Sequence, residues 1–510
     1  MNRTTTISPR CEFREILPRS TGTPRVDATL ESRREFNAAG QSDIKEFLPQ
    51  SDRTRNLSDS VSSNSADSAE DNTASVHQRV LVITSTYPRH ADDGAASWMR
   101  ETHRQMTKRG HRITVLAPAY KGLSSHTLDG IEVRRFRYAP ASIERLTHEE
   151  GSGRNTRNGY LQLLAIPYII FGCITAAWLV LTRKFDAVYV YSPYPNGLLG
   201  QIARLFSGAP LMIMTHSAEF PQARRKTWAN PFLKQSLQAA DLLISDCSDT
   251  AQKVTKLSQR KCHILPFGTN GSVANQLQPK NKVPQVLFSG ELTECKGLEY
   301  LLRAVPQIVK KHPAQFIIVG NGDQRSKLEK LHQKLGLGEA VKFLGTVSDA
   351  QLSHEFANCD IWVNPTALDS HGNTEGLSEG VIQAYNYSKP VVAGRIGANL
   401  DAVVDGVTGR LVPEKDSAAL ADAICELLAD PAKRQHMGRN GFYFAQTAFS
   451  HKQTVKALEA MTLELTRTPK LAPTLADNRS AFHSLNQLRS DCRSHVKASP
   501  YNSCAISALS

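Results

Sequence analysis

The chain has 510 residues, of which 40% are hydrophobic and 21% are charged, so it is long enough to bury the cores of two or three ordinary domains. Its formal net charge of +13 indicates an anionic partner such as a nucleotide or a membrane surface, and nucleic acid is not expected because no nucleic-acid-binding motif is found. The nine cysteines, an odd number without paired spacing, argue against a disulfide framework and a zinc site and favour reduced thiols in a cytoplasm.

Both ends of the chain differ in composition from the middle. Residues 1–77 are rich in Ser, Thr, Asp and Arg and contain no apolar run, and residues 467–510 are similarly polar. Segments of this composition cannot bury enough apolar surface to offset the entropy lost on ordering, so we expect two disordered tails. We expect no signal peptide, since no charged stretch followed by an apolar run opens the chain.

Short apolar strands alternate with helix-length segments from about Gln78 onward. In the first expected domain, residues 78–274, the strands are nearly continuous apolar runs, which is typical of strands buried on both faces of a parallel sheet. The expected strands are 79–85, 111–118, 186–192, 210–216, 241–247 and 262–268. This alternation predicts right-handed βαβ units in a doubly wound sheet.

The stretch from Tyr160 to Leu181, YLQLLAIPYIIFGCITAAWLVL, is uncharged and long enough to span a bilayer. A spanning helix would place strands of one sheet on opposite sides of the membrane, and a helix buried in the core is an alternative. We favour a helix partly embedded at the interface, where Arg183, Lys184 and the cations of 224–226 would meet anionic headgroups. The protein would then be cytoplasmic and peripheral on the inner face of the cell membrane.

A polar linker over 275–284 is followed by a second set of strands in the expected domain 285–448. Those strands are 285–290, 315–320, 341–345, 360–365, 390–394 and 409–413. The pattern predicts a second doubly wound parallel sheet, and a helix over 449–466 is expected to return towards the first domain. Two such domains joined by one linker face each other across a cleft, and ligands in these folds bind at the carboxyl ends of the strands.

The stretch GNTEGLSEGVIQAYN (372–386) predicts a loop that turns into a helix. Glu375 stands at the helix entrance, and Gln383 follows eight residues later. Because helix N-termini present free N–H groups and the positive end of a dipole, the turn at 376–378 is suited to binding a diphosphate.

Several segments carry a resemblance to a known family. In the second half they are FSGELTECKGLEYLL (288–302), IIVGNGDQRSKLE (317–329), VKFLGTV (341–347), EGLSEGVIQA (375–384), KPVVAGRIGANLDAVVDGVTGRLVP (389–413) and FSH (449–451); in the first half they are TSTYPRHADDGAASWMRETHRQMTKRGHRITVLAP (84–118) and THSAEF (215–220). Together they resemble glycosyltransferase family 4, the retaining sugar-nucleotide transferases with two Rossmann-like domains in the GT-B fold. The resemblance spans roughly 79–466 and implies a bacterial-type transferase of cell-surface polysaccharide, exopolysaccharide or glycolipid synthesis.

The resemblance implies a donor site on the second domain and an acceptor site on the first. Glu375 would contact the hydroxyls of the donor sugar, Lys296 would add a cation beside the diphosphate, and His216 would lie near the sugar and the acceptor; these are the implied catalytic residues. The other implied donor-binding residues are Gly94, Glu291, Gly320, Gly322, Thr346, Val347, Gly376, Leu377, Ser378 and Gln383. No D-x-D sequence stands at a strand end, so we expect no metal and no cofactor besides the nucleotide-diphosphate sugar.

Two of these positions depart from the family's pattern. Glu291 stands where the family usually has Arg, and Gln383 stands where it usually has Glu. An amide oxygen still accepts a hydrogen bond from a ribose hydroxyl. An anion about 4 Å from the diphosphate would instead be repelled by about 4 kcal/mol at an effective dielectric near 20. We expect Glu291 to slow transfer unless it points away or pairs with Lys296, and Arg395 is a candidate for the missing cation.

The expected partners are a nucleotide-sugar donor, a lipid-linked or saccharide acceptor and an anionic membrane surface. The resemblance implies that the acceptor hydroxyl attacks from the face that the nucleotide leaves, which retains the configuration. One alternative is a catalytically impaired sugar-nucleotide-binding protein of the same fold, and another is a sugar-nucleotide epimerase with its own acid and base carboxylates. A dinucleotide dehydrogenase is disfavoured, because no strand is followed by G-x-G-x-x-G.

Overall fold

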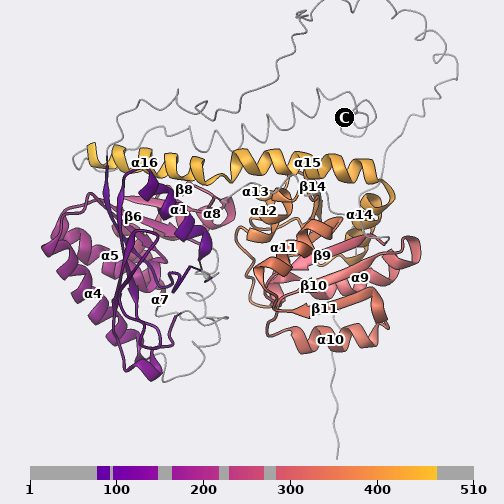
Figure 1. The fold of residues 1–510 in the computed structure, drawn as a ribbon, viewed down its shortest axis with the longest axis horizontal. Helices are drawn as coiled ribbons and strands as arrows, with labels where there is room; N and C mark the ends of the chain where they lie inside the picture. The colour runs from indigo at the N-terminus through magenta and orange to yellow at the C-terminus, as the bar shows by residue number, and fades with distance from the viewer. Residues whose placement is uncertain are drawn as a thin grey trace, which may run out of the picture. The chain divides into compact units, whose positions relative to one another are not determined.

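The computed structural model describes residues 77–91, 93, 96–147, 163–216, 229–268 and 283–467 (Figure 1). The expected tails lie outside these residues apart from His77 and Arg467, and so does most of the expected linker.

The first domain contains an eight-stranded sheet in the order β3-β4-β2-β1-β5-β6-β7-β8. Its strands are β1 (Arg79–Ile83), β2 (Arg112–Pro118), β3 (His126–Leu128), β4 (Ile131–Phe136), β5 (Ala187–Tyr191), β6 (Leu211–Thr215), β7 (Leu242–Ser245) and β8 (His263–Ile264). Every pair of neighbouring strands is parallel except β3 with β4. The six strands expected in this half are all present, within one or two residues at most ends.

Helices cover both faces of this sheet, so the expected doubly wound arrangement is confirmed. They are α1 (Ser97–Lys108), α4 (Ala165–Thr182), α5 (Pro193–Ser207), α7 (Ala229–Ala239) and α8 (Ser248–Ser258), with a 3-10 turn η1 (Ala141–Ile143). Leu81 and Ile83 pack with α4, α5 and α7, whereas Val80 and Val82 pack with α1 on the other face. Successive side chains of a strand point to opposite faces, so burial on both faces explains the continuous apolar sequence of β1.

The strands β3 and β4 were not predicted from the sequence. In β4, the buried Ile131 and Val133 alternate with the charged Glu132 and Arg134, so this strand has no continuous apolar run. The signal that was present is the Asp129–Gly130 pair between the two strands, where both residues have positive φ, 52° and 78°. Asp-Gly is a strong hairpin turn sequence because such turns require positive φ at both central residues.

The second domain contains a six-stranded, wholly parallel sheet in the order β11-β10-β9-β12-β13-β14. Its strands are β9 (Gln285–Ser289), β10 (Gln315–Val319), β11 (Val341–Gly345), β12 (Ile361–Asn364), β13 (Val391–Gly394) and β14 (Gly409–Val412). All six agree with the sequence prediction. The strand β9 lies between β10 and β12, so the segments that follow these strands share one edge of the sheet.

Helices cover both faces of the second sheet as well. The helices α9 (Leu298–Lys311), α10 (Arg325–Lys334) and α14 (Ser417–Ala429) pack on one face. The other face is covered mainly by α11 (Asp349–Asn358), α12 (Glu379–Asn386), α13 (Asn399–Ala402) and α15 (Pro431–Ala448). Two further 3-10 turns are η2 (Glu294–Lys296) and η3 (Gly338–Ala340).

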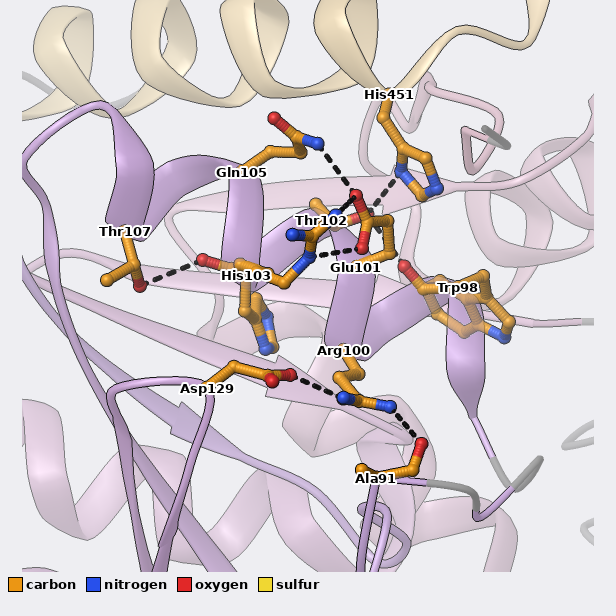
Figure 2. Close-up of polar contacts among 11 residues, drawn as sticks. Ala91, Trp98, Arg100, Glu101, Thr102, His103, Gln105, Thr107, Asp129 and His451 are labelled. Carbon is orange, nitrogen blue, oxygen red and sulfur yellow. Dashed lines mark hydrogen bonds and ion pairs between the residues drawn. The ribbon is translucent and has the colours of Figure 1, made fainter. Parts of the chain in front are cut away.

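The last described helix, α16 (His451–Arg467), packs against the first domain beside α1 (Figure 1). The Oγ1 of Thr102 on α1 lies 3.2 Å from the Nδ1 of His451 (Figure 2). Further along α16, the guanidinium of Arg109 donates to Glu459 at 2.7 Å. Burial lowers the pKa of His451 to about 4, so its ring is neutral at physiological pH. The chain therefore returns to the first domain through a packed contact that includes the neutral ring of His451 and the ion pair between Arg109 and Glu459.

Two glycines allow the loops at the carboxyl ends of β9, β10 and β11 to approach closely. Gly320 has a φ of +129°, and a Cβ there would lie 1.9 Å from the carbonyl oxygen of Gly290. A Cβ on Gly322 would lie 2.4 Å from the carbonyl oxygen of Leu292. The N–H of Gly320 also donates to the carbonyl of Gly345 at 2.8 Å. Backbone approach within the protein therefore explains both glycines, independently of any nucleotide.

Replacing Gly320 by Ala is expected to destabilise the second domain, because the added Cβ would collide with the Gly290 carbonyl. Gly336→Ala is the matched control, since its φ is +62° but nothing lies within 4 Å of its added Cβ. We expect Gly336→Ala to cost about 1 kcal/mol and Gly320→Ala roughly 2 kcal/mol more. The shifts in the urea unfolding midpoint of the full chain measure this, and equal shifts would contradict the proposed role of the close approach.

Candidate functional site

The carboxyl ends of β9 and β12 bring together Lys296 and Glu375, which lie 79 residues apart in the chain. Lys296 is the last residue of η2, and Glu375 lies in the loop between β12 and α12. The Lys296 ammonium forms an ion pair with one carboxylate oxygen of Glu375, and their side chains are only 13% and 16% exposed. The other oxygen accepts a hydrogen bond from Thr366 Oγ1 at 3.3 Å. Two predicted site residues therefore neutralise each other in a largely buried position.

Local backbone contacts hold η2 against the loop that follows β12. Gly297, at a φ of +65°, lies so close to this loop that a Cβ would be 2.0 Å from the carbonyl oxygen of Pro365. The N–H of Ala367 donates to the carbonyl of Cys295 at 3.0 Å, and the Oγ of Ser370 donates to Glu294 at 2.9 Å. A residue other than glycine at position 297 would push η2, and with it Lys296, away from Glu375.

The helix α12 begins at Glu379, not at the turn 376–378 where the sequence placed its opening. Ser378 is the N-cap and has extended backbone angles, so Glu375 precedes the first helical residue by four positions. Gly380 allows the helix to lie against Trp362, since a Cβ there would be 2.3 Å from the indole ring. The indole N–H in turn donates to Ser289 Oγ at 3.0 Å, which ties the start of α12 to the ends of β12 and β9.

The other predicted donor-site residues differ in their exposure to solvent. Glu291 and Thr346 are exposed, Gly376, Gln383 and Val347 are half-buried, and Leu377 and Ser378 are buried. Gln383 lies in α12, as expected. Arg395, the candidate for the missing cation, forms an ion pair with Asp405 and donates to the carbonyl of Leu411 at 2.9 Å, beside β14. The charge of Arg395 is therefore already paired with Asp405.

Some predicted positions lie outside the described residues. These are Gly94 and the segments 217–220 and 224–226. Within the described residues, no group of three or more His, Cys, Asp or Glu side chains could hold a metal ion.

In the first domain, His216 follows β6 at the carboxyl edge of the sheet. Its Nδ1 lies 3.4 Å from a carboxylate oxygen of Asp246, which follows β7. The ring contacts Trp98 edge-on at 5.0 Å and is stacked with Tyr191 at 6.3 Å between centroids. A small pocket, partly open to solvent, has these four residues in its wall. Its remaining lining combines apolar residues, among them Phe267 after β8 and Leu458 on α16, with the hydroxyl-bearing residues Thr102, Thr215, Ser245 and Thr454.

One residue that the sequence analysis did not identify is Glu379, the first residue of α12. Its burial raises the pKa of its carboxyl group, and the nearby Lys296 charge opposes this effect. No sequence signal marked Glu379, because Glu375 lies in the loop before α12 and the two acids do not share a helix face.

Two family models match the chain in succession. The model for Glycosyltransferase Family 4 matches residues 93–271, and the model for Glycosyl transferases group 1 matches residues 272–443. The chain is 24% identical, over 72% of its length and 93% of the relative, to a GDP-mannose-dependent alpha-(1-6)-phosphatidylinositol monomannoside mannosyltransferase of Mycolicibacterium smegmatis. It is 33% identical to a D-inositol 3-phosphate glycosyltransferase of Corynebacterium urealyticum, over 36% of this chain and 44% of that one.

Solved structures show the same fold. The sucrose-phosphate synthase from Thermosynechococcus elongatus matches with a TM-score of 0.61 and 20% identity, over 76% of this chain and 99% of that one. Anabaena HepE in complex with UDP and glucose matches with a TM-score of 0.55 and 20% identity, over 76% and 100% of the two chains. The expected GT-B fold is therefore confirmed.

The Lys296–Glu375 pair is expected to contribute to stability as a coupled unit. Lys296→Met or Glu375→Gln alone leaves a largely buried charge without its partner, whereas the double variant leaves none. We expect a coupling energy of about 1–3 kcal/mol between the two substitutions, obtained from urea unfolding of the wild type, both single variants and the double variant.

The exposed pair Lys311–Asp422 is the matched control for this cycle. Its side chains are 51% and 65% exposed, so solvent screens the attraction, and we expect a coupling below about 0.5 kcal/mol. Additive effects at Lys296 and Glu375 would mean that their contact adds no stability of its own.

Proposed function

Because this chain belongs to the glycosyltransferases that join a family 4 region to a group 1 region, we propose that it is a retaining, metal-independent enzyme that moves a sugar from a nucleotide-diphosphate donor to an acceptor hydroxyl. The observation that carries the proposal is the Lys296–Glu375 ion pair. It lies at the carboxyl ends of two adjacent parallel strands, where ligands bind in doubly wound folds.

On this proposal the donor replaces the contact between the two side chains. The diphosphate forms an ion pair with the Lys296 ammonium and accepts hydrogen bonds from the N–H groups at the start of α12. The released Glu375 carboxylate then accepts hydrogen bonds from the sugar hydroxyls. As the bond between sugar and diphosphate breaks, negative charge grows on the leaving phosphate. The ammonium and the helix N-terminus stabilise that charge more strongly than they stabilise the bound donor, which lowers the barrier.

The proposed transfer needs no nucleophilic side chain. The acceptor oxygen bonds to the anomeric carbon on the face from which the diphosphate leaves, and its proton passes to the departing phosphate oxygen. The protein then acts mainly by orienting the two substrates. His216, in contact with Asp246 in the first-domain pocket, would lie near the acceptor.

The position of Glu291 weakens the alternative of a catalytically impaired binding protein. Its side chain is exposed, so the repulsion from a diphosphate falls towards the value in water, about 1 kcal/mol at 4 Å. The substitution of Arg by Glu at this position therefore does not by itself exclude turnover. The other departure, Gln383, retains an amide oxygen that is able to accept from a ribose hydroxyl.

The helix α4 supports a membrane-associated acceptor. It is long and apolar enough to cross a bilayer, which alone is weak evidence. One side of α4, including Tyr168, Ala176 and Leu179, is buried against the first domain, so the helix is attached to the sheet. The opposite side is exposed by between 51% and 66% at Ile166, Ile170, Ile174, Trp178 and Leu181.

These exposures contradict the alternative of a helix buried in the core. A spanning helix is also disfavoured, since α4 connects β4 to β5 of the same sheet. The adjacent helix α5 extends the apolar surface with Leu205 and Phe206, which are 74% and 50% exposed. We propose that this surface binds the cytoplasmic face of an anionic membrane and that the acceptor is lipid-linked or a saccharide assembled there.

The activity test replaces the two residues that would contact the donor. Lys296→Ala and Glu375→Ala are each expected to lower sugar transfer at least about a hundredfold, because each removes a group that stabilises the transition state. The assay measures nucleotide release from UDP-glucose and GDP-mannose with membrane lipid extract as acceptor. Lys311→Ala, an exposed lysine of α9, is the control and should retain wild-type transfer. Near-wild-type transfer by either site variant, once circular dichroism shows that it is folded, would contradict the assignment of Lys296 and Glu375 to the donor site.

The membrane test uses flotation with vesicles that contain anionic phospholipids. We expect the wild type to float with the vesicles, less at high salt because salt screens the attraction of Lys and Arg to the headgroups. The triple variant Ile170→Ser, Ile174→Ser, Trp178→Ser should remain unbound. Tyr443→Ser, which changes an exposed aromatic residue on α15, should float like the wild type. A wild type that binds no vesicles at either salt concentration contradicts the proposal.

A further inference from the structure

Two exposed cations, Lys121 and Arg137, lie at the carboxyl edge of the first sheet. Lys121 follows β2 and Arg137 follows β4, and these strands are parallel neighbours whose last residues, Pro118 and Phe136, are paired in register. The N–H of Ala119 donates to the carbonyl of Phe136 at 2.8 Å, which holds the two following segments together. Both cations therefore lie at the edge where ligands bind in doubly wound folds.

A buried carboxylate holds both cations in place. The Glu144 side chain is 0% exposed; it accepts from the Arg137 guanidinium at 3.0 Å and from the N–H of Gly122 at 2.9 Å. Its backbone carbonyl accepts from the N–H of Lys121 at 3.1 Å. Lys121 is thereby held at a φ of +47°, which is uncommon for a residue other than glycine. The two cations are thus positioned by the protein before any ligand binds.

The positive charge at this edge faces solvent, whereas the negative charge does not. The Arg137 side chain is 56% exposed, although its partner Glu144 is fully buried. Lys121 is also exposed, and among the described residues no carboxylate forms an ion pair with it. An anion that approaches from solvent therefore meets two cations and no exposed carboxylate of this cluster.

Arg89, in the loop after β1, adds a third cation beside Lys121. The Arg89 guanidinium and the Lys121 ammonium lie 5.6 and 5.0 Å from the centroid of the Tyr120 ring. Arg89 is paired with Asp93, but the carboxylate side chain is only 5% exposed, compared with 35% for Arg89. Arginine and lysine in such a cluster are suited to phosphate, because their N–H groups donate charge-assisted hydrogen bonds to its oxygens.

The cationic cluster adjoins one end of the apolar surface of α4. Phe136 and Tyr138, on either side of Arg137, pack edge-on against Tyr168 in the first turn of α4, at 5.1 and 5.6 Å between ring centroids. Ile166, in the same turn, is 61% exposed. Phosphate-binding groups and an exposed apolar surface therefore lie next to each other.

A membrane lipid has the same combination, since its phosphate lies directly above its acyl chains. We propose that Lys121 and Arg137 bind the phosphate of an anionic membrane lipid. The inference rests on the proposed membrane surface of α4 and α5. The sequence placed the headgroup contacts at the other end of α4, where Arg183 is already paired with Glu132. Binding at Lys121 and Arg137 instead brings the headgroup to the carboxyl edge, where the acceptor would react.

The experiment measures binding of the full chain to sedimenting vesicles of phosphatidylcholine, alone or mixed with phosphatidylglycerol. Lys121→Asn removes the charge, and Asn adopts positive φ more readily than most residues. We expect Lys121→Asn and Arg137→Gln each to weaken binding to the anionic vesicles about fivefold, whereas Lys121→Arg should bind like the wild type. Lys415→Asn is the matched control, since Lys415 is an exposed lysine at a φ of +61° between β14 and α14 of the second domain. It should not change binding.

Arg137→Gln leaves the buried Glu144 without its cation, so this variant is informative only if circular dichroism shows that it is folded. Lys121→Asn removes no ion pair among the described residues and tests the proposal by itself. Equal binding by the wild type and Lys121→Asn would overturn the phosphate site. An equal loss in Lys415→Asn would also overturn it, because the attraction would then depend only on net charge.

Two further outcomes identify the source of a failure. A wild type that binds no anionic vesicles would overturn the membrane surface and this inference with it, whereas the donor site is tested separately by sugar transfer in the Lys296 and Glu375 variants. Calorimetric titration with glycerol 3-phosphate tests a soluble phosphate ester. If Lys121→Asn loses that binding but retains binding to vesicles, the ligand is the soluble ester and the lipid is excluded.

Discussion

The contact between Lys296 and Glu375 depends on the order of strands in the second sheet. Because β9 and β12 are neighbours, the segments after them meet at one edge, although their residues are far apart in the chain. The close approach of Gly297 to the carbonyl of Pro365 then fixes the distance between these segments. The pair leaves neither charge unpaired in the free protein, so the site remains stable while empty. On the proposed function, a donor would replace this contact with stronger ones, which would favour ligands that supply both a diphosphate and hydroxyl groups.

Burial decides which carboxylates of the donor region have the larger effect. Glu291 is conspicuous in the sequence because it stands where the resembled family usually has Arg. Its side chain is exposed, however, so solvent screens its charge. Glu379 is inconspicuous in the sequence, but burial raises the pKa of its carboxyl group, and the charge of Lys296 opposes this effect. The electrostatic effect of each carboxylate therefore depends on the depth of its side chain as well as on the identity of the residue.

The two domains have different roles in the proposed reaction. The second domain holds the charged groups suited to a diphosphate, whereas the pocket of the first domain is lined mainly by apolar and aromatic side chains around His216. The same domain carries the exposed apolar surface of α4 and α5. On the proposal that this surface binds a membrane, an acceptor with a lipid portion would be presented by the same domain. The helix α16, which packs on α1, covalently connects this domain to the donor domain through α15.

The sequence by itself determined the strands of both doubly wound sheets, because strands buried on both faces are continuous apolar runs, and it located Lys296, Glu375 and His216 through segments shared with a family. It missed β3 and β4, whose half-buried pattern alternates. Only the tertiary structure decided that Lys296 pairs with Glu375 and that one side of α4 remains exposed. The helix α4 is apolar on all sides, so no periodicity distinguishes its two faces. Pairing and burial depend on distant segments that strand order brings together, and local sequence does not contain that information.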